Sequence, residues 1–306
     1  MLVCRSLPLL LVSLFCLAPA FVKGLSSPGA PNAAGQGRVL EGLNVSSRIL
    51  DRDVNYAVYL PPDYQASTRR YPVVYLLHGF TDDESAWIQL GEVNLAADRA
   101  IAGRSLPPMI IVMPDGGVTW YVNDHRDEIR FEDMFVREFI PHIDAAFRTR
   151  PSGEFRGVSG LSMGGWGTLM FAFRHPDLFS SCAAFSAAIF TDEGFAAMEP
   201  PLYENMMAPV FGPGLSGKAR LTPHFRKYNP LDLARTLPAD SLKKARYYID
   251  CGDDDFLING NMALHSLLLE RGIPHEFRVR NGGHTWAYWR TGISDGLKFI
   301  GESFHR

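Results

Sequence analysis

Cysteine is scarce in this chain. Only four of its 306 residues are cysteines, and two of them, Cys4 and Cys16, lie in an apolar segment near the N-terminus. The other two, Cys182 and Cys251, are too few to form a disulfide framework. Both lie in apolar, strand-like runs, where a buried free thiol is the ordinary interpretation. A bridge between them is the alternative in an oxidising compartment.

An excess of charge of one sign is also missing. The formal net charge is −3, and the charged residues are interspersed along the chain rather than gathered in blocks. This composition offers no basic field for nucleic acid, which excludes nucleic acid as an expected partner. With 46% hydrophobic residues and no internal repeat, we expect one globular domain acting on a small, uncharged substrate.

No hydrophobic run is clearly long enough to span a membrane. The main candidate, residues 7–21, follows a positively charged start and includes the small-residue site Ala18-Pro19-Ala20. This pattern predicts a secretory signal peptide over residues 1–24. A retained membrane anchor is the alternative. We therefore expect a secreted or periplasmic protein with no stable membrane insertion once the signal is removed.

The next residues predict a flexible leader followed by an α/β domain. Residues 25–37 are rich in Ser, Pro, Gly and Ala, and the domain is expected over residues 38–306. Partial alternation in residues 39–47 and 49–60 predicts an antiparallel strand pair at a sheet edge. Short apolar runs then predict strands that are covered on both faces, as in a parallel sheet. These strands are residues 73–77, 109–113, 155–159, 182–188, 245–251 and 275–280.

Helical patterns separate these strands, which implies right-handed crossovers and a three-layer domain. One apolar face repeats every four residues from Phe135 to Phe147, although Pro141 should kink or break that helix. Other faces run over residues 264–268, ending at Gly272, and over residues 289–300. Residues 191–238 instead hold many prolines and glycines with exposed-looking aromatics and methionines. Such an insertion indicates a functional loop or lid, and a surface excursion with a small satellite core is the alternative.

The stretch GVSGLSMGGW, residues 157–166, contains the G-x-S-x-G pattern of a nucleophile elbow. The pattern alone is weak, because a small serine in a glycine-rich turn would match it too. Ser162, however, follows a predicted strand and precedes a predicted helix, which is the context the elbow requires. Ser159 lacks the second glycine at the right spacing. Ser162 is therefore the candidate nucleophile.

A serine hydrolase on this fold needs an acid and then a histidine, in that chain order. Asp255 follows the strand at residues 245–251, where carboxylates point into the ligand crevice of an α/β sheet. Asp253 and Asp254 are alternatives, as is a purely structural acidic turn. His284 lies in the loop Asn281-Gly282-Gly283 that follows the last strand, and it is the candidate base.

The oxyanion donors are expected to be backbone N–H groups. One is that of Met163, the residue after the nucleophile, and the other is that of Phe80, in the loop after the strand at residues 73–77. Gly79 would permit close approach of that loop. His78, beside it, is expected to shape the loop rather than act as a base.

Five motifs occur together in this chain: LLHGF, MPDGG followed by WY, GLSMGG, YYIDCGDDDFL and NGGHTW. In this order they resemble the putative-esterase family, which includes feruloyl and acetyl esterases, esterase D (S-formylglutathione hydrolase) and secreted mycolyltransferases. The resemblance runs from about residue 39 to the C-terminus. It implies an α/β-hydrolase three-layer sandwich, with a mostly parallel sheet and an antiparallel N-terminal edge. It also implies Ser162, Asp255 and His284 as a triad and Phe80 and Met163 as oxyanion donors, but it leaves the acyl group open.

We therefore expect a secreted serine carboxylic-ester hydrolase that works through an acyl-enzyme and needs no metal or other cofactor. Asp82, Asp83 and Glu84 could resemble a cation cluster, but a solvated helix start is the expected interpretation. Four aromatics are expected near the mouth, either stacking on substrate or packing: Trp87, Trp120, Tyr121 and Trp286.

Stacking on a phenolic acyl group or a sugar would favour feruloyl or acetyl esters of plant polysaccharide as substrates. The ester substrate would be either a small molecule or a group linked to the polysaccharide. An acyltransferase or a thioesterase like S-formylglutathione hydrolase would use the same triad. A non-catalytic binding module on the same fold is the alternative from another class.

Overall fold

The computed structural model describes residues 35–304, all within the chain's unit Asn32–Arg306. The predicted signal peptide and most of the predicted leader lie outside the described residues. None of the helices described in residues 35–304 combines the length and the apolar character needed to cross a membrane.

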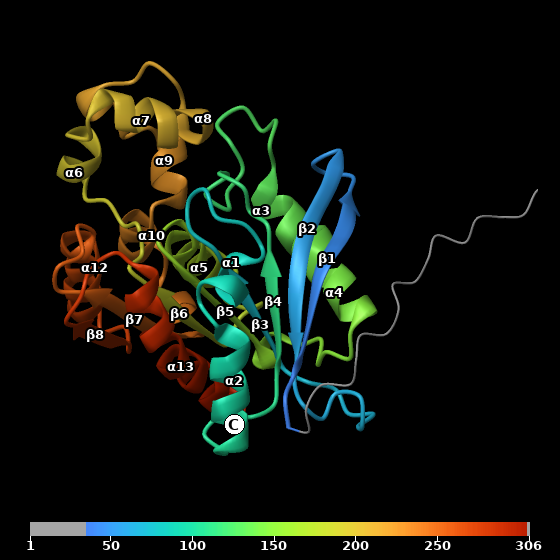
Figure 1. Cartoon of the computed structure of the whole chain (residues 1–306). Helices are drawn as coiled ribbons and strands as arrows, with labels where there is room; N and C mark the ends of the chain where they lie inside the picture. Colours follow the sequence, from blue (N-terminus) through green and yellow to red (C-terminus); the bar gives the residue numbers. More distant parts are fainter. Residues whose placement is uncertain (1–34, 305–306) are drawn as a thin grey trace, which may run out of the picture. The chain divides into compact units, whose positions relative to one another are not determined.

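A central sheet of eight strands organises residues 35–304 (Figure 1). The strands are β1 (Arg38–Ser47), β2 (Arg52–Leu60), β3 (Val73–Leu77), β4 (Ile110–Pro114), β5 (Arg156–Leu161), β6 (Ser181–Phe185), β7 (Arg246–Gly252) and β8 (Glu276–Arg280). Their order in the sheet is β1-β2-β4-β3-β5-β6-β7-β8. The β1–β2 and β2–β4 pairs are antiparallel and the other pairs are parallel. The predicted fold class, with its antiparallel N-terminal edge, is confirmed.

Helices cover both faces of the sheet, because successive side chains of a buried strand point to opposite sides. Val74 and Leu76 of β3 pack in one apolar cluster with Ile293. Val73, Tyr75 and Leu77 pack in the other cluster, on the opposite face. The first face is covered by α1 (Ala86–Gln89), α2 (Val93–Ala102) and α13 (Trp286–Ser303), and the second by α3 (Phe131–Met134), α4 (Ile140–Ala146), α5 (Met163–Arg174) and α12 (Ile258–Glu270).

Of the kink or break predicted at Pro141, the break does not occur. Instead of a break, a π-helical turn, η1 (Phe135–Phe139), joins α3 directly to α4, and Pro141 lies in the first turn of α4. Proline has no N–H to donate, and its ring would clash with the carbonyl one turn earlier. The wider π turn occurs just where that clash would arise, so the apolar face continues through the proline.

The insertion at residues 191–238 consists mainly of short helices, which the sequence patterns did not predict. It contains α6 (Asp192–Ala196), α7 (Pro200–Met206), α8 (Ala208–Phe211), the 3-10 turn η3 (Gly217–Arg220), α9 (Pro223–Tyr228) and α10 (Pro230–Thr236), with α11 (Ala239–Leu242) after it. The expectation of exposed aromatics is wrong, because Tyr203, Phe211, Phe225 and Tyr228 are buried. The rings of Phe195 and Phe225 stack with centroids 3.8 Å apart. The insertion thus has an aromatic interior that is continuous with the main core.

The insertion also contacts the loop that follows β4. Trp120 Nε1 donates to the Met206 carbonyl at 2.9 Å, and the His125 N–H donates to the Val210 carbonyl at 2.9 Å. Figure 1 shows α7 and α8 beyond the tip of β4, at the carboxyl end of that strand. The insertion therefore lies at the edge of the sheet where α/β proteins bind ligands.

Cys182 of β6 and Cys251 of β7 are both buried and unbridged. Burial raises the pKa of each thiol well above its ordinary value. The interpretation as buried free thiols is confirmed, and the alternative disulfide does not form.

Candidate active site

Ser162 occupies the turn between β5 and α5. Its backbone has φ +54° and ψ −116°, a conformation that non-glycine residues rarely adopt. Such a strained conformation persists only where the surrounding structure imposes it, and it is often found at functional sites. The predicted strand-turn-helix context of this serine is confirmed.

The glycines around Ser162 are required by close packing of the backbone. A Cβ on Gly160 would lie 2.6 Å from the Gly164 carbonyl oxygen, and a Cβ on Gly164 would lie 2.4 Å from the Leu77 carbonyl oxygen. Both distances are shorter than carbon–oxygen contacts allow. The first helical turn of α5 can therefore lie against β3 and β5 only with glycine at these two positions.

Three side chains from distant parts of the chain form one hydrogen-bonded row. Ser162 Oγ lies 3.0 Å from His284 Nε2, and His284 Nδ1 lies 2.9 Å and 3.1 Å from the two carboxylate oxygens of Asp255. An ionised carboxylate only accepts hydrogen bonds, so Nδ1 carries the proton of the neutral ring and Nε2 accepts from the Ser162 hydroxyl. The structure thus brings together the three residues that the sequence predicts.

Asp255 is the one nearly buried carboxylate of the acidic turn after β7, with 2% of its surface exposed. Burial alone would raise its pKa, but hydrogen bonds from His284, the Leu257 N–H and Ser186 hold the pKa of Asp255 below its ordinary value. It is therefore ionised at neutral pH, as an acceptor for the imidazole must be.

The two neighbouring aspartates are exposed, and each forms a hydrogen bond with the backbone of the loop that carries His284. Asp253 Oδ1 accepts the Gly282 N–H at 2.9 Å, and the Asp254 N–H donates to the Gly282 carbonyl at 3.1 Å. These bonds fasten the loop that carries His284 to the end of β7. The choice of Asp255 over Asp253 and Asp254 agrees with this geometry.

The loop after β3 lies against Ser162. A Cβ on Gly79 would come within 2.8 Å of Leu161 Cδ1 and 3.8 Å of Ser162 Cβ, so only glycine permits this approach. The next residue is Phe80, whose N–H makes no hydrogen bond within residues 35–304. Met163 begins α5, so its N–H has no partner inside the helix. Two unused backbone donors therefore lie on either side of the serine.

His78 holds this loop in place. It is 1% exposed, and its Nδ1–H donates to the Gly79 carbonyl at 2.7 Å while its Nε2 accepts the Gly116 N–H at 2.8 Å. His78 thus links the loops after β3 and β4, which agrees with its predicted role in shaping the loop.

Three of the four aromatics predicted near the mouth are packing residues. Trp87, Trp120 and Tyr121 are at most 1% exposed, which leaves no ring face for a substrate. Trp87 Nε1 donates to the Leu77 carbonyl at 2.9 Å, and Tyr121 Oη donates to the His78 carbonyl at 3.1 Å. These rings instead pack under the loop after β3 that carries the Phe80 N–H. Trp286 is partly exposed and remains a candidate for substrate contact.

The acidic run beside this loop is a helix start. Asp83 Oδ1 accepts hydrogen bonds from the Ser85 N–H at 2.8 Å and the Ser85 hydroxyl at 2.6 Å, directly before α1. This bonding pattern fits the interpretation as a solvated helix start.

Sequence reasoning missed two residues at the site. Ser186, which follows β6, is fully buried at φ +44°, accepts a hydrogen bond from Trp289 Nε1 at 3.0 Å and helps to lower the pKa of Asp255. Phe256 is 75% exposed, and its ring centroid lies 4.7 Å from that of His284. No motif indicates Ser186. The position of Phe256, next to Asp255, was the only available signal for that ring.

The sheet order, the strained serine turn and the Ser162–His284–Asp255 row define an α/β-hydrolase fold. The chain belongs to the family described as Putative esterase, whose sequence profile matches residues 47–300.

Two relatives and one solved structure show the range of the similarity. Esterase Rv1288 of Mycobacterium tuberculosis is 30% identical over 253 residues, which are 75% of this chain and 52% of the relative. The endo-1,4-beta-xylanase/feruloyl esterase of Xylanibacter ruminicola is 29% identical over 203 residues, 55% of this chain and 27% of that protein. A solved ferulic acid esterase has a TM-score of 0.76 at 28% identity, covering 88% of this chain and 99% of that one. This chain thus spans about half the length of the first relative, and less of the second.

Proposed function

We propose that this protein is a serine carboxylic-ester hydrolase that forms an acyl-enzyme at Ser162. The observation that carries the proposal is the hydrogen-bonded row from Ser162 through His284 to Asp255, at a strained turn beside two unused backbone donors. The names of the similar proteins, esterase and ferulic acid esterase, support the same reaction class.

In the first half-reaction, His284 Nε2 takes the proton of the Ser162 hydroxyl as Oγ attacks the ester carbonyl carbon. The carbonyl oxygen becomes negatively charged and accepts hydrogen bonds from the N–H groups of Phe80 and Met163. Asp255 stays ionised and stabilises the imidazolium. The tetrahedral intermediate then expels the alcohol, which takes the proton from His284 and leaves Ser162 acylated.

In the second half-reaction, water replaces the alcohol. His284 Nε2 removes a proton from the water as its oxygen attacks the acyl carbon, and the same two N–H groups hold the oxyanion. Collapse of this intermediate breaks the bond to Ser162 Oγ, which regains its proton from His284. The carboxylic acid leaves, and the enzyme is restored.

We infer further that the acyl group is feruloyl or acetyl, on plant polysaccharide, and that the protein is exported. The names of the X. ruminicola relative and of the solved ferulic acid esterase support an aromatic acyl group. The exposed Phe256 ring beside His284 offers such a group an apolar surface. The signal-like composition of residues 1–24 supports export.

The proposal is tested with a fluorophosphonate probe on the chain without residues 1–24. We expect one labelled site, and peptide mapping should place it at Ser162, with no label on the Ser162→Ala variant. Label on another serine would contradict Ser162 as the nucleophile. No label on the folded protein would favour the alternative of a non-catalytic binding module.

Substrate class is tested by comparing turnover of methyl ferulate, p-nitrophenyl acetate and S-formylglutathione. We expect oxygen esters to be hydrolysed with the higher kcat/KM. A preference for S-formylglutathione would identify a thioesterase instead. Accumulation of a transfer product when an alcohol acceptor is added at millimolar concentration would identify an acyltransferase. Export is tested separately, by cell fractionation and N-terminal sequencing of the exported chain.

A further inference from the structure

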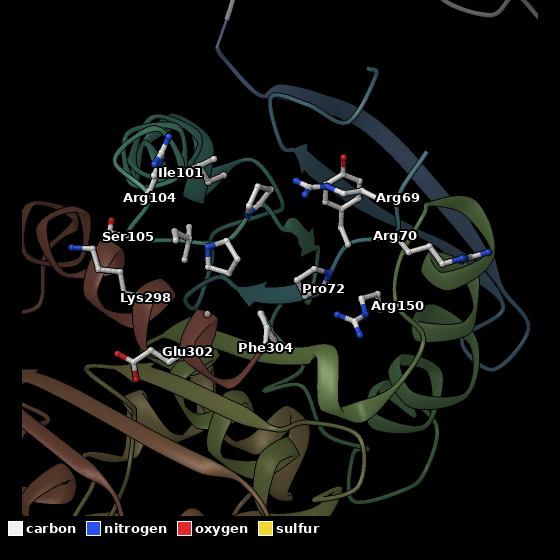
Figure 2. Close-up of a pocket in the computed structure, with 15 residues that line it drawn as sticks. Arg69, Arg70, Pro72, Ile101, Arg104, Ser105, Arg150, Lys298, Glu302 and Phe304 are labelled. Atoms are coloured by element: carbon white, nitrogen blue, oxygen red, sulfur yellow. The ribbon is translucent and has the colours of Figure 1, made fainter. Parts of the chain in front are cut away.

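A pocket lies at the edge of the sheet opposite Ser162. It has a volume of about 740 Å³ (Figure 2). Its lining includes Pro72, directly before β3, Pro108, shortly before β4, and Arg150, a few residues before β5. These residues precede the amino ends of the strands, whereas Ser162, Asp255 and His284 follow carboxyl ends. The pocket is therefore separate from the site described above.

The lining of this pocket is strongly cationic. Its five cationic side chains are Arg69, Arg70, Arg104, Arg150 and Lys298. The only carboxylate in the lining is that of Glu302, which pairs with Arg246 at 3.0 Å, a residue outside the lining. Although the whole chain has a net charge of −3, folding gathers these cations from four separate segments around one cavity. This concentration produces a local positive potential.

Several of these charges are available to a ligand. Within residues 35–304, Arg104 and Arg150 form no ion pair, and both are exposed. The guanidinium group of Arg150 stacks on the ring of Phe155, with Cζ 3.0 Å from the ring centroid, which leaves its edge for a ligand. Arg69 pairs with Asp63 at 2.6 Å, but these side chains are 50% and 39% exposed, so the pair is weak and an anion can displace it. Arg70 donates to the Thr149 carbonyl at 3.0 Å and points away from the pocket in Figure 2.

The geometry of these charges indicates more than one anionic group on the ligand. Figure 2 shows Arg69 and Arg150 on one side of the pocket and Arg104 on the other. Arg104 lies in the turn that follows α2, with φ +58°, a left-handed conformation that is uncommon for a non-glycine residue. Between the arginines, the half-buried side chains of Ile101, Pro107 and Pro108 form an apolar wall.

We propose that this pocket binds a small ligand that carries two or more carboxylate or phosphate groups on a compact scaffold. The guanidinium groups of Arg69, Arg104 and Arg150 bind the anionic groups, because the planar fork of arginine matches both carboxylate and phosphate. The apolar wall contacts the scaffold between them. The volume is within the usual range of small-molecule sites.

The test is calorimetric titration of the chain without residues 1–24 at low salt. The probes are trigalacturonate for carboxylates on a sugar, tripolyphosphate for phosphate, and neutral maltotriose. We expect at least one anionic probe to bind, to bind more weakly at higher salt, and to lose about tenfold or more in affinity in the variant Arg69→Gln/Arg104→Gln/Arg150→Gln. Binding of trigalacturonate identifies an acidic saccharide, and binding of tripolyphosphate identifies a phosphorylated ligand.

A matched triple variant distinguishes binding at this pocket from a general effect of removing three positive charges. Arg137, Arg235 and Arg278 are 66%, 54% and 55% exposed and lie outside the pocket, so changing all three to Gln should alter affinity less than about twofold. The proposal is overturned if no anionic probe binds, if maltotriose binds equally well, or if the two triple variants lose equal affinity. Thermal unfolding and p-nitrophenyl acetate hydrolysis should be unchanged. If the pocket variant does not fold, the single changes Arg104→Gln and Arg150→Gln should each weaken binding about threefold.

Discussion

Ser186 Oγ lies 3.0 Å from Trp289 Nε1, and the same hydroxyl helps to lower the pKa of the Asp255 carboxyl group. Because the serine accepts from the indole N–H, its own proton is not used in that bond and is free to stabilise the ionised carboxylate. It joins the first turns of α13 to the acid that orients His284. Ser186 is therefore a positioning residue for the proposed triad.

Changing Ser186 to Ala should lower kcat for p-nitrophenyl acetate about tenfold while KM stays within about twofold. The variant loses a hydroxyl that stabilises the ionised Asp255, the group that orients the base but does not contact substrate. Ser181→Ala is the matched control, since Ser181 begins β6 and is also fully buried, but its hydroxyl has no hydrogen-bond partner within residues 35–304. A rise in KM with unchanged kcat would show that Ser186 acts on binding instead.

Phe256 should discriminate between acyl groups. Its ring is 75% exposed and lies 4.7 Å from the His284 ring, so it can cover an aromatic acyl chain but reaches little of an acetyl group. Phe256→Ala should raise KM for methyl ferulate about fivefold and change kcat/KM for p-nitrophenyl acetate less than twofold. Leu269→Ala, at a 60% exposed position on α12, is the control for loss of exposed apolar surface. Equal losses on both esters would contradict this role.

Glu132 should make the fold sensitive to acid. It is 4% exposed and accepts hydrogen bonds from Arg174 Nε at 2.7 Å and from His175 Nε2 at 2.8 Å. Burial alone would raise its pKa, but these partners lower the pKa of Glu132 from 4.5 to about 2. A depressed pKa contributes stability above pH 4.5 that is lost as pH falls toward 2, here about 3 kcal/mol.

Urea unfolding of wild type and Glu132→Gln at pH 6 and pH 3 measures this contribution. The variant should be less stable at pH 6, and the difference between the two proteins should shrink at pH 3. Exposed Glu154, changed to Gln, serves as the control. A difference that is the same at both pH values would mean that the carboxylate charge contributes nothing.

The two thiols give a direct test of the redox state. The chain without residues 1–24 should titrate two thiols in denaturant without reductant, because Cys182 and Cys251 are unbridged. In the folded protein neither should react readily, since both are buried and their pKa values are raised. A titre of zero in denaturant would show that they are bridged.

The sequence predicts most of the sheet because its strands are buried on both faces. Runs such as residues 73–77 and 109–113 are continuously apolar for that reason, and continuous burial leaves a clear pattern. The continuity of the helix around Pro141 was harder to predict, because a proline indicates a break whether or not a π turn accommodates it. Burial of the aromatics at residues 191–238 depends on contacts between short helices, which no local pattern records.

The residues of the site were predictable where backbone geometry imposes a motif. Gly160, Gly164 and Gly79 are required by close approaches, and this leaves a signature around Ser162 and Phe80. For Trp87, Trp120 and Tyr121 the sequence left stacking on substrate and packing both open, and the structure shows packing, because an aromatic beside a motif is as often a support as a contact. Ser186 was missed since its role comes from register between β6, β7 and α13 rather than from any local pattern.

Hydrolysis of p-nitrophenyl acetate by Ser162→Ala tests the central claim most directly. Ser159→Ala is the control, because Ser159 is buried in β5 and its hydroxyl donates to the Ala183 carbonyl. We predict that Ser162→Ala lowers kcat by about 10⁴-fold or more while its unfolding midpoint stays close to that of wild type. We predict that Ser159→Ala keeps most of its activity. Turnover by folded Ser162→Ala within about tenfold of wild type would contradict the account.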